Sequence, residues 1–560
     1  MAFNWENYKE QEWFTSPRQE ILDRVFQEAY ESGEDGKNTE NPFNNLPPEH
    51  ELNKDPDLLL GLKHAFDDGL KDGRQVRENK EMHNTNEHVE HLNEKCGVFG
   101  IYGKNLDVSR LTFYGLFALQ HRGQESSGIA TADGNHIDCY KNMGLVTHVY
   151  NEETIQNLKG HIAIGHNRYS TSEGSHIKHA QPVVIENQLA LAHNGNLPSV
   201  KKLKEFLEAK DISTNDCSDS ELMAKALGYY LEHGLSIKDA VIKSYPLFTG
   251  AFCLTILTRD CLVAVRDTYG IRPLSLGKID GGYVMASETC AFHTVGAEFV
   301  REIQPGEMVI VSADGIESVQ IEPSQTKVDI FEFVYFARPD SNILGKSVYE
   351  VRRNCGIRLA KEYPVKADIV VPVPETAYPV ASGYSSASGI PMEMALVKNR
   401  YIHRTFIQPE QHSRDLGVKL KLTPLTEVLK GKKIIVMDDS IVRGTTSRQL
   451  IKMLFEAGCT EVHMLISSPP VKFPDFYGID TPRQERLIAS HKTVEEIRQF
   501  LGATSLYFLS LKGLIESTGL SEDLFCTSCF TGVYPLDIGE RKADVKEPAY
   551  SQTKTGTALF

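Results

Sequence analysis

One short stretch of the chain changes sharply from apolar to polar character. Residues 433–437 read KIIVM, and two acids, Asp438 and Asp439, follow directly. An apolar run of this length bounded by charges predicts a buried strand of a parallel sheet. A small, hydroxyl-rich turn at residues 443–447 then leads into RQLIKMLFEAG, whose apolar spacing is that of an amphipathic helix. The pattern therefore predicts a strand, a turn at its carboxyl end and a helix.

Strand and helix patterns alternate from about Ser347. VYEVRRNCGIRLAKEY predicts a helix, ADIVVPVPE a strand and ASGYSSASG the start of another helix. This alternation predicts a parallel sheet with helices on its faces. We therefore predict an α/β domain over residues 326–535.

The preceding part of the chain has a different pattern of apolar and polar residues. From Cys96 it reads CGVFGIYG, and later segments such as GAFCLTIL alternate with Gly/Pro turns, which predicts packed antiparallel sheets over residues 96–325. Residues 1–95 are polar, with helical patterns at 18–32 and 56–72; we predict a mostly flexible leader or propeptide, the alternative being a docking arm. The polar residues 536–560 predict a disordered tail.

Composition narrows the class of protein. The 560 residues carry a net charge of −15, and residues 1–95 hold 22 acidic against 11 basic side chains, so we expect no nucleic-acid partner. No apolar run approaches the roughly 18 residues of a membrane span, and we expect no membrane partner. The ten cysteines are scattered, which favours free thiols. Since the amino terminus lacks the apolar segment of a signal peptide, we predict a cytoplasmic protein.

The turn after residues 433–437 has the chemistry of a phosphate site. Ligands of open α/β sheets bind at the carboxyl ends of strands, where a helix N-terminus offers N–H groups to a phosphate. Gly444 allows close approach of the backbone, and Thr445 and Thr446 add hydroxyl donors. No triphosphate-loop motif is present, and the paired acids suit the hydroxyls of a ribose and its Mg²⁺. The alternative interpretation is a solvated acidic turn.

This stretch resembles the phosphoribosyl pyrophosphate (PRPP) signature of type I phosphoribosyltransferases. The resemblance implies that Mg²⁺ is held by Thr376 with the two aspartates, although the loop 375–378, reading ETAY, departs from the usual Asp-Ser-Gly turn. Residues 398–421 resemble the loop that closes over PRPP and excludes water. The resemblance implies that the PRPP site is formed by Asp438, Asp439, Arg443, Gly444, Thr445 and Thr446, and the wall of an ammonia passage by Tyr401, Arg404 and Phe406.

A second group of motifs begins at Cys96. Alone, this cysteine could be a buried core thiol. Downstream stand LQHRGQESSGI, GHNRYSTSEGS, LAHNGNL and CSDSELM, and together these resemble the class II, N-terminal-nucleophile (Ntn) glutamine amidotransferases. No Cys–His pairing is evident, so the free α-amine of Cys96 is the candidate base for its thiol. That base requires a chain that starts at Cys96. We therefore predict cleavage between Lys95 and Cys96 by the chain's own chemistry, the alternative being a later start of translation.

The resemblance also implies roles for residues of the later motifs. Asn194 and Gly195 would supply the oxyanion donors, while Arg168 would hold the carboxylate of glutamine and Asp219 its amino group. The alternative interpretations are a hairpin turn for Asn194 and Gly195 and a surface ion pair for Arg168.

Three further motifs are similar to those of the amidophosphoribosyltransferases: RDTYGIRPLSLG, ASETCAF and VREIQPGEMV. We expect the two halves to meet at the segment FEFVYFARPDSNILG, which contains Tyr335, Arg338 and Asp340. This resemblance implies an α+β Ntn glutaminase sandwich followed by an α/β type I phosphoribosyltransferase domain. The implied reaction converts glutamine, PRPP and water into 5-phosphoribosylamine, glutamate and pyrophosphate, the first step of purine synthesis. A homotetramer inhibited by purine nucleotides is also implied.

The motif CTSC raises the question of an iron–sulfur cluster. Many relatives of this family bind one with four cysteines, whereas here Cys526 and Cys529 are accompanied by Asp329 and Asp475 at the other two positions. Because such clusters favour thiolates, we expect none. Two other classes remain open from sequence: a glutamine-dependent enzyme that shares only the first domain, such as a sugar-phosphate aminotransferase or an asparagine synthetase, and a non-catalytic PRPP sensor.

Overall fold

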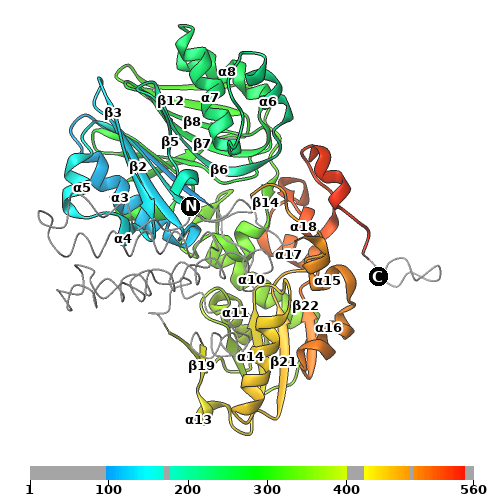
Figure 1. Cartoon of the computed structure of the whole chain (residues 1–560). Helices are drawn as coiled ribbons and strands as arrows, with labels where there is room; N and C mark the ends of the chain where they lie inside the picture. The colour runs from blue at the N-terminus through cyan, green and yellow to red at the C-terminus, as the bar shows by residue number, and fades with distance from the viewer. Residues whose placement is uncertain (1–95, 170–176, 400–421, 479–482, 549–560) are drawn as a thin grey trace, which may run out of the picture. The chain divides into compact units, whose positions relative to one another are not determined.

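The computed structural model describes residues 96–169, 177–399, 422–478 and 483–548. Two antiparallel sheets come first along the chain, and a parallel sheet follows (Figure 1). Within the described residues, the helices are too short or too polar to cross a membrane.

The first domain stacks its two antiparallel sheets face to face. Side chains such as Val98, Ile164 and Leu262 form the core between the sheets. Strand order is β11-β9-β10-β1-β4-β2-β3 in one sheet and β13-β12-β8-β7-β6-β5 in the other. The strands are β1 (Gly97–Tyr102), β2 (Ser126–Ala132), β3 (Ile137–Met143), β4 (Ile162–Arg168), β5 (Val183–Ile185), β6 (Leu189–Ser199), β7 (Thr249–Leu257), β8 (Leu262–Arg266), β9 (Ser275–Ile279), β10 (Gly282–Ala286), β11 (Glu298–Glu302), β12 (Glu307–Ser312) and β13 (Gly315–Gln320).

Helices cover the outer face of each sheet. The core outside the first sheet includes buried residues of α3 (Val108–Ala118) and α9 (Cys290–Val295), and the core outside the second includes those of α6 (Lys201–Glu208), α7 (Asp219–Glu232) and α8 (Ile237–Ser244). Because both faces of the sheets are covered, every residue of β1 is buried, which explains its unbroken run of small and apolar residues. This four-layer arrangement confirms the predicted sandwich.

A short connecting segment follows the first domain. β14 (Val328–Asp329) pairs in parallel with β23 (Phe525–Cys526), and a π-helix (Glu332–Phe336) comes next. The two-residue strands β15 (Asn342–Ile343) and β16 (Lys346–Ser347) complete the segment. The connection is therefore tied to the carboxyl-terminal part of the chain.

The second domain is the predicted α/β unit. Its parallel sheet has the order β17-β20-β21-β22, with strands Ile369–Pro372, Lys433–Asp438, Glu461–Ile466 and Ser505–Phe508. One core contains buried residues of α10 (Val348–Glu362), α11 (Tyr378–Ser388) and α17 (Leu511–Thr518), and the other those of α14 (Thr445–Glu456) and α16 (Val494–Leu501). The predicted strand at 433–437 is β20, and the helix predicted after it is α14.

The prediction of a disordered tail after residue 535 is wrong for residues 536–548. Ile538 is buried, and residues Gly539–Asp544 form a 3₁₀-helix. The backbone carbonyl of Leu536 accepts a hydrogen bond from the hydroxyl of Tyr477 at 2.7 Å, and the carbonyl of Lys546 accepts one from Gln484. These contacts fix a polar sequence that lacks the apolar content for a core of its own.

Helices α10 and α11 pack through two glycines, and this contact yields a stability prediction. A Cβ atom at Gly356 would lie 1.8 Å from the carbonyl oxygen of Val380, and one at Gly383 would lie 1.9 Å from that of Arg353. Gly356→Ala must therefore separate the helices, and we expect a loss of about 1–3 kcal/mol in the free energy of unfolding, measured by thermal or urea unfolding. Lys361→Ala, at an exposed position of α10, is the control. Equal stability of the two variants would contradict this packing.

Candidate active sites

Cys96 lies directly before β1. β1 pairs with β4 so that Gly97 is opposite Asn167, and Arg168, the next residue of β4, acts electrostatically on the thiol of Cys96. Burial raises the pKa of the Cys96 thiol, while a backbone hydrogen bond from Tyr169 and the charge of Arg168 oppose that rise only in part. The thiol is therefore protonated at neutral pH and needs a base before it can act as a nucleophile.

Arg168 and Asp219 bring one cation and one anion to the surroundings of this thiol. Arg168 donates to Glu125 at 2.7 Å, and since both side chains are buried, the alternative of a surface ion pair is wrong. Asp219 is the first residue of α7 and accepts a hydrogen bond from the backbone N–H of Leu197 at 3.2 Å. Burial alone would raise the pKa of Asp219, but the neighbouring His193 and backbone N–H groups hold it below its usual value. A carboxylate that stays ionised can receive an ammonium group.

Asn194 and Gly195 lie inside β6 and pair along β7, so the alternative of a hairpin turn is wrong. Gly195 has a φ of 150°, and a Cβ there would lie 2.0 Å from the carbonyl oxygen of Ala251. Nδ2 of Asn194 donates to the hydroxyl of Ser287 at 3.3 Å, and the same hydroxyl accepts from the N–H of Val98 at 3.0 Å. Oδ1 of Asn194 is buried and lacks a hydrogen-bond partner within the described part of the chain. Because an amide oxygen can only accept, the Asn194 group that could bind an oxyanion is Nδ2.

The histidines of the motifs contact other groups. Nε2 of His166 lies 3.0 Å from the carbonyl oxygen of His193, and burial lowers the pKa of His166 to about 3, so this ring is neutral. Nδ1 of His193 lies 3.1 Å from the hydroxyl of Ser220, and His121 lies 2.7 Å from Glu288. These contacts agree with the inference that His does not activate the Cys96 thiol.

The second group of candidate residues lies at the carboxyl end of β20. The side chain of Asp439 is buried, and its two oxygens accept hydrogen bonds from Ser440 at 2.7 Å and Thr376 at 2.5 Å. Thr376 comes from the loop after the neighbouring strand β17, so the sheet brings together residues that are distant in sequence. Burial raises the pKa of Asp439. Carboxylate and hydroxyl oxygens at one edge are suitable ligands for Mg²⁺, which keeps most of its coordination for water and phosphate.

The predicted phosphate turn is adjacent to these acids. Gly444 has a φ of 82° and immediately precedes α14, so a side chain there would be strained. Thr445 and Thr446 occupy the first turn of α14, the end of a helix that favours an anion. Arg443 is half-buried before them. The turn therefore has the local structure that the sequence predicts.

Other predicted residues have mixed outcomes. Tyr401, Arg404 and Phe406 lie outside the described residues, between β18 (Leu396–Lys398) and β19 (Leu422–Pro424), which pair with each other. Arg338 contacts the first domain as predicted, because its Nη1 donates to the carbonyl oxygen of Ala118 at 3.1 Å. Asp340 pairs with Arg338 at 2.8 Å, and Tyr335 packs against a core of the second domain.

The residues at the four positions where relatives bind an iron–sulfur cluster lie close together, as the resemblance implies, but they lie around a cation. These residues are Asp329, Asp475, Cys526 and Cys529. Nη1 of Arg272 lies 2.9 Å from Asp329, and its Nη2 lies 3.8 Å from Asp475. Burial raises the pKa of Cys526 to about 12, and the two carboxylates add to this rise, so the thiol stays protonated. Because an iron–sulfur cluster needs thiolates, this donor set does not fit one.

The second domain also touches the strand that carries Asn194 and Gly195. Nδ2 of Asn196 donates to the carbonyl oxygen of Phe476 at 2.9 Å, and a Cβ at Gly478 would lie 3.0 Å from the carbonyl carbon of Gly195. Only a backbone without a side chain could come this close. Parts of both domains therefore meet at the candidate oxyanion strand.

Comparison with known families defines the class of protein. The model of a glutamine amidotransferase domain matches residues 166–294, and that of a phosphoribosyl transferase domain matches residues 342–468. Together with the two folds and their sites, these matches define a glutamine amidotransferase joined to a phosphoribosyltransferase.

Longer matches identify the family. The chain is 49% identical over 455 residues to the amidophosphoribosyltransferase of Synechococcus elongatus, covering 80% of this chain and 92% of the relative. A solved structure of the allosteric regulatory enzyme of purine biosynthesis is 45% identical with a TM-score of 0.75, covering 80% of this chain and 97% of its own. A Bacillus subtilis glutamine PRPP amidotransferase complexed with ADP and GMP is 45% identical with a TM-score of 0.74, covering 80% and 98%. The chain belongs to the amidophosphoribosyltransferase family, which confirms the resemblance seen in its motifs.

Several residues at the junction of the domains were missed by sequence reasoning. Four of them lie within motifs that carry the resemblance: Arg122, Arg272, Glu288 and Glu332. Their charged side chains are buried, and the sequence did not indicate which of them form ion pairs with one another. Arg352 lies in a predicted helix, where an arginine is usually exposed. Only the three-dimensional fold shows that these side chains are buried together.

Proposed function

We propose that the chain is a pentosyltransferase that converts glutamine, PRPP and water into 5-phosphoribosylamine, glutamate and pyrophosphate. The observation that carries this proposal is that the family relationship extends over both domains while each retains its own candidate site. A glutamine-dependent enzyme that shares only the first domain would have no use for the second site. Ammonia released in the first site would pass inside the protein to the second.

In the first site, glutamine would be oriented by its amino-acid end. Arg168, itself oriented by Glu125, would bind the carboxylate as a fixed fork, and the ionised Asp219 would bind the ammonium group. The amide carbonyl would then face the thiol of Cys96. This placement brings the reacting atoms together before any bond changes.

The thiol of Cys96 would transfer its proton to the α-amine of the same residue and attack the amide carbon. The oxyanion would be bound by Nδ2 of Asn194 and the N–H of Gly195. Collapse of this intermediate would release ammonia and leave a thioester, which water hydrolyses to glutamate. Because burial raises the pKa of the thiol, the base is needed at neutral pH.

In the second site, ammonia would attack C1 of PRPP and pyrophosphate would leave. Mg²⁺ would be held by Thr376, Asp438 and Asp439 together with PRPP oxygens, and it would neutralise the charge of the departing pyrophosphate. Arg443 and the Gly444–Thr446 turn would bind phosphate at the N-terminus of α14. We assign the wall of the ammonia passage to Tyr401, Arg404 and Phe406, as the resemblance implies.

We further propose a cytoplasmic homotetramer that purine nucleotides inhibit. The nucleotide proposal is supported by the B. subtilis relative, whose structure was solved with ADP and GMP. The domain boundaries that we propose are 1–95, 96–325, 326–535 and 536–560.

Two variants test the division of labour between the sites. Cys96→Ala should lower glutamine-dependent synthesis by at least about 10³-fold while synthesis from PRPP and added ammonia persists. Asp439→Asn should lower both activities on the order of 10²-fold, because both need the second site. Asp368→Asn is the matched control, since Asp368 caps the opposite end of β20 by accepting from the N–H of Lys433 at 2.8 Å. Unchanged glutamine-dependent synthesis in Cys96→Ala, or no PRPP-dependent turnover in the parent, would refute the proposal.

The mass of the active chain tests the base. If the α-amine of Cys96 is the base, the mature protein must start at Cys96, and intact-mass spectrometry should find the chain without residues 1–95. Cys96→Ala, which removes the thiol needed for self-cleavage, serves as the comparison. Full glutamine-dependent activity in a preparation whose mass still includes Met1 would exclude this base.

We also propose that the protein holds no iron–sulfur cluster. The purified protein should be colourless and contain neither iron nor inorganic sulfide in stoichiometric amounts, because Asp329 and Asp475 are carboxylates paired with Arg272. Elemental analysis and visible absorption after anaerobic purification provide the measurement. Iron and sulfide at cluster stoichiometry would contradict this expectation.

A further inference from the structure

We propose that Arg122 positions the Cys96 nucleophile and that Glu332, from the segment leading into the phosphoribosyltransferase domain, holds Arg122 in place. Glutamine cleavage would then depend on a residue outside the glutaminase domain. This inference rests on the proposed function, because it assumes that Cys96 attacks glutamine. It assigns Arg122 and Glu332 as positioning residues, since neither would touch the substrate.

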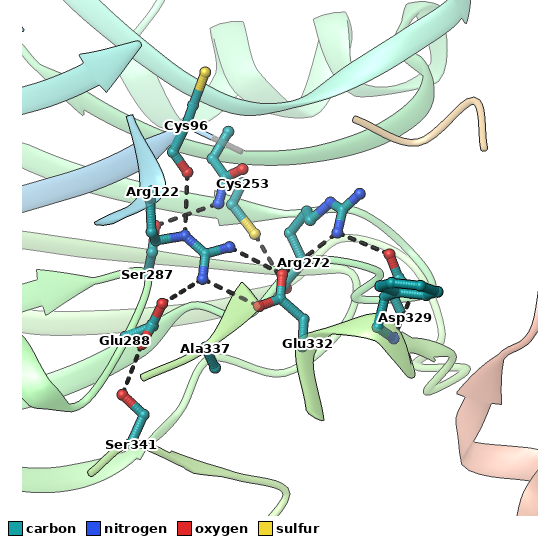
Figure 2. A network of polar contacts seen from close by, with 12 residues as sticks. Cys96, Arg122, Cys253, Arg272, Ser287, Glu288, Asp329, Glu332, Ala337 and Ser341 are labelled. Carbon is teal, nitrogen blue, oxygen red and sulfur yellow. Dashed lines mark hydrogen bonds and ion pairs between the residues drawn. The ribbon is translucent and has the colours of Figure 1, made fainter. Parts of the chain in front are cut away.

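The first step is the contact between Arg122 and Cys96. Nε of Arg122 donates to the backbone carbonyl oxygen of Cys96 at 3.3 Å, from a side chain that is only 1% exposed. Cys96 precedes the first residue of β1, so the strand ladder itself does not fix this residue. Figure 2 shows Arg122 between the carbonyl group of Cys96 on one side and two carboxylates on the other. The hydrogen bond therefore orients the residue that carries both the thiol and the α-amine.

The second step is the pair of carboxylates that holds Arg122. Nη1 donates to Glu288 at 2.5 Å and to Glu332 at 3.0 Å, and Nη2 donates to Glu332 at 2.9 Å. Glu332 therefore receives two parallel hydrogen bonds, which fix the plane of the guanidinium group. Burial alone would lower the pKa of Arg122, but Glu332 and Glu288 raise it, so the cation is kept. Loss of the Glu332 charge would leave the plane of Arg122 poorly defined.

The third step is the attachment of Glu332 to the second domain. Glu332 begins the π-helix, and Arg352 of α10 donates from Nε to the carbonyl oxygen of Phe333 at 2.8 Å and from Nη2 to that of Ala337 at 2.9 Å. Arg352 thus clamps the backbone of the π-helix at both ends. Single π-helical turns occur often at functional sites. The same guanidinium also acts electrostatically on Asp439, the buried acid of the second site.

Together these contacts form a continuous path from α10 to the nucleophile. Arg352 holds the π-helix, the π-helix presents Glu332, Glu332 holds Arg122, and Arg122 holds the carbonyl group of Cys96. Every side chain in this path is buried, so water cannot replace a lost partner without a cavity. A displacement of the nucleophile by about 1 Å can cost about 10²-fold in rate.

The test uses Glu332→Gln in the full-length chain. We expect the kcat for glutamine hydrolysis to fall by about 10²-fold, because the nucleophile is misplaced, whereas the KM for glutamine changes little, since Arg168 and Asp219 are untouched. Synthesis from PRPP and added ammonia should stay within about 2-fold of the parent, because it does not use Cys96. Arg122→Lys keeps the charge but loses the fork, and it should give the same separation of the two activities.

Glu307→Gln is the matched control. Glu307 is a buried carboxylate of the first domain that receives two hydrogen bonds, at 2.8 and 2.6 Å, from one partly exposed arginine, Arg301. It should leave both activities unchanged. A parallel fall of glutamine-dependent and ammonia-dependent turnover in Glu332→Gln and Arg122→Lys, or no fall in either, would overturn the inference. Activity of Cys96→Ala with glutamine would instead refute the proposed function itself.

Discussion

Buried arginines at the junction of the two domains constrain the rest of the structure. Arg122, Arg272 and Arg352 are almost completely inaccessible to water, and a buried guanidinium is costly unless its N–H groups and its charge are matched. Arg122 and Arg272 share the carboxylate of Glu332, and Arg352 bonds to backbone carbonyls beside it. Arg122 has partners from both domains, and Arg272 of the first domain bonds to residues of the second, so the first domain could not satisfy these two charges alone. The junction is therefore part of the folded core and not a linker.

This constraint explains why the candidate oxyanion strand is not an isolated feature of the first domain. The carbonyl oxygen of Phe476 accepts from Asn196, one residue after Gly195, and Gly478 lies against Gly195 itself. The guanidinium of Arg272 donates to the carbonyl oxygen of Tyr477 at 3.0 Å and so fixes the same segment from the other side. The geometry of the first site is thus completed by backbone groups of the second domain, in addition to the path through Arg122.

The sequence predicted the fold well where local patterns decide it. The spacing of apolar residues in the single sequence was enough to predict the strand at 433–437 and the helix after Ser347. It also showed the change to strand-like sequence at Cys96. The resemblance implied that Thr376 and Asp439 lie together, and the structure brings them together because the carboxyl ends of neighbouring parallel strands meet at one edge. The ordered residues 536–548 could not be predicted, because their stability comes from backbone hydrogen bonds to distant residues such as Gln484 and Tyr477. The role of Arg122 was hidden for the same reason, since its partners are far away in sequence.

The surroundings of Arg272 show how charge balance limits what this junction can hold. Asp329 and Asp475 bring two negative charges to a buried place, and Arg272 supplies a compensating cation. Cys526 and Cys529 lie in the field of the same carboxylates, and the pKa of each thiol is raised by burial and further by that field, so both stay neutral. A thiolate here would add uncompensated negative charge to a medium of low polarity. The two aspartates therefore do more than remove two sulfur ligands, because they also disfavour the ionised form of the two cysteines that remain.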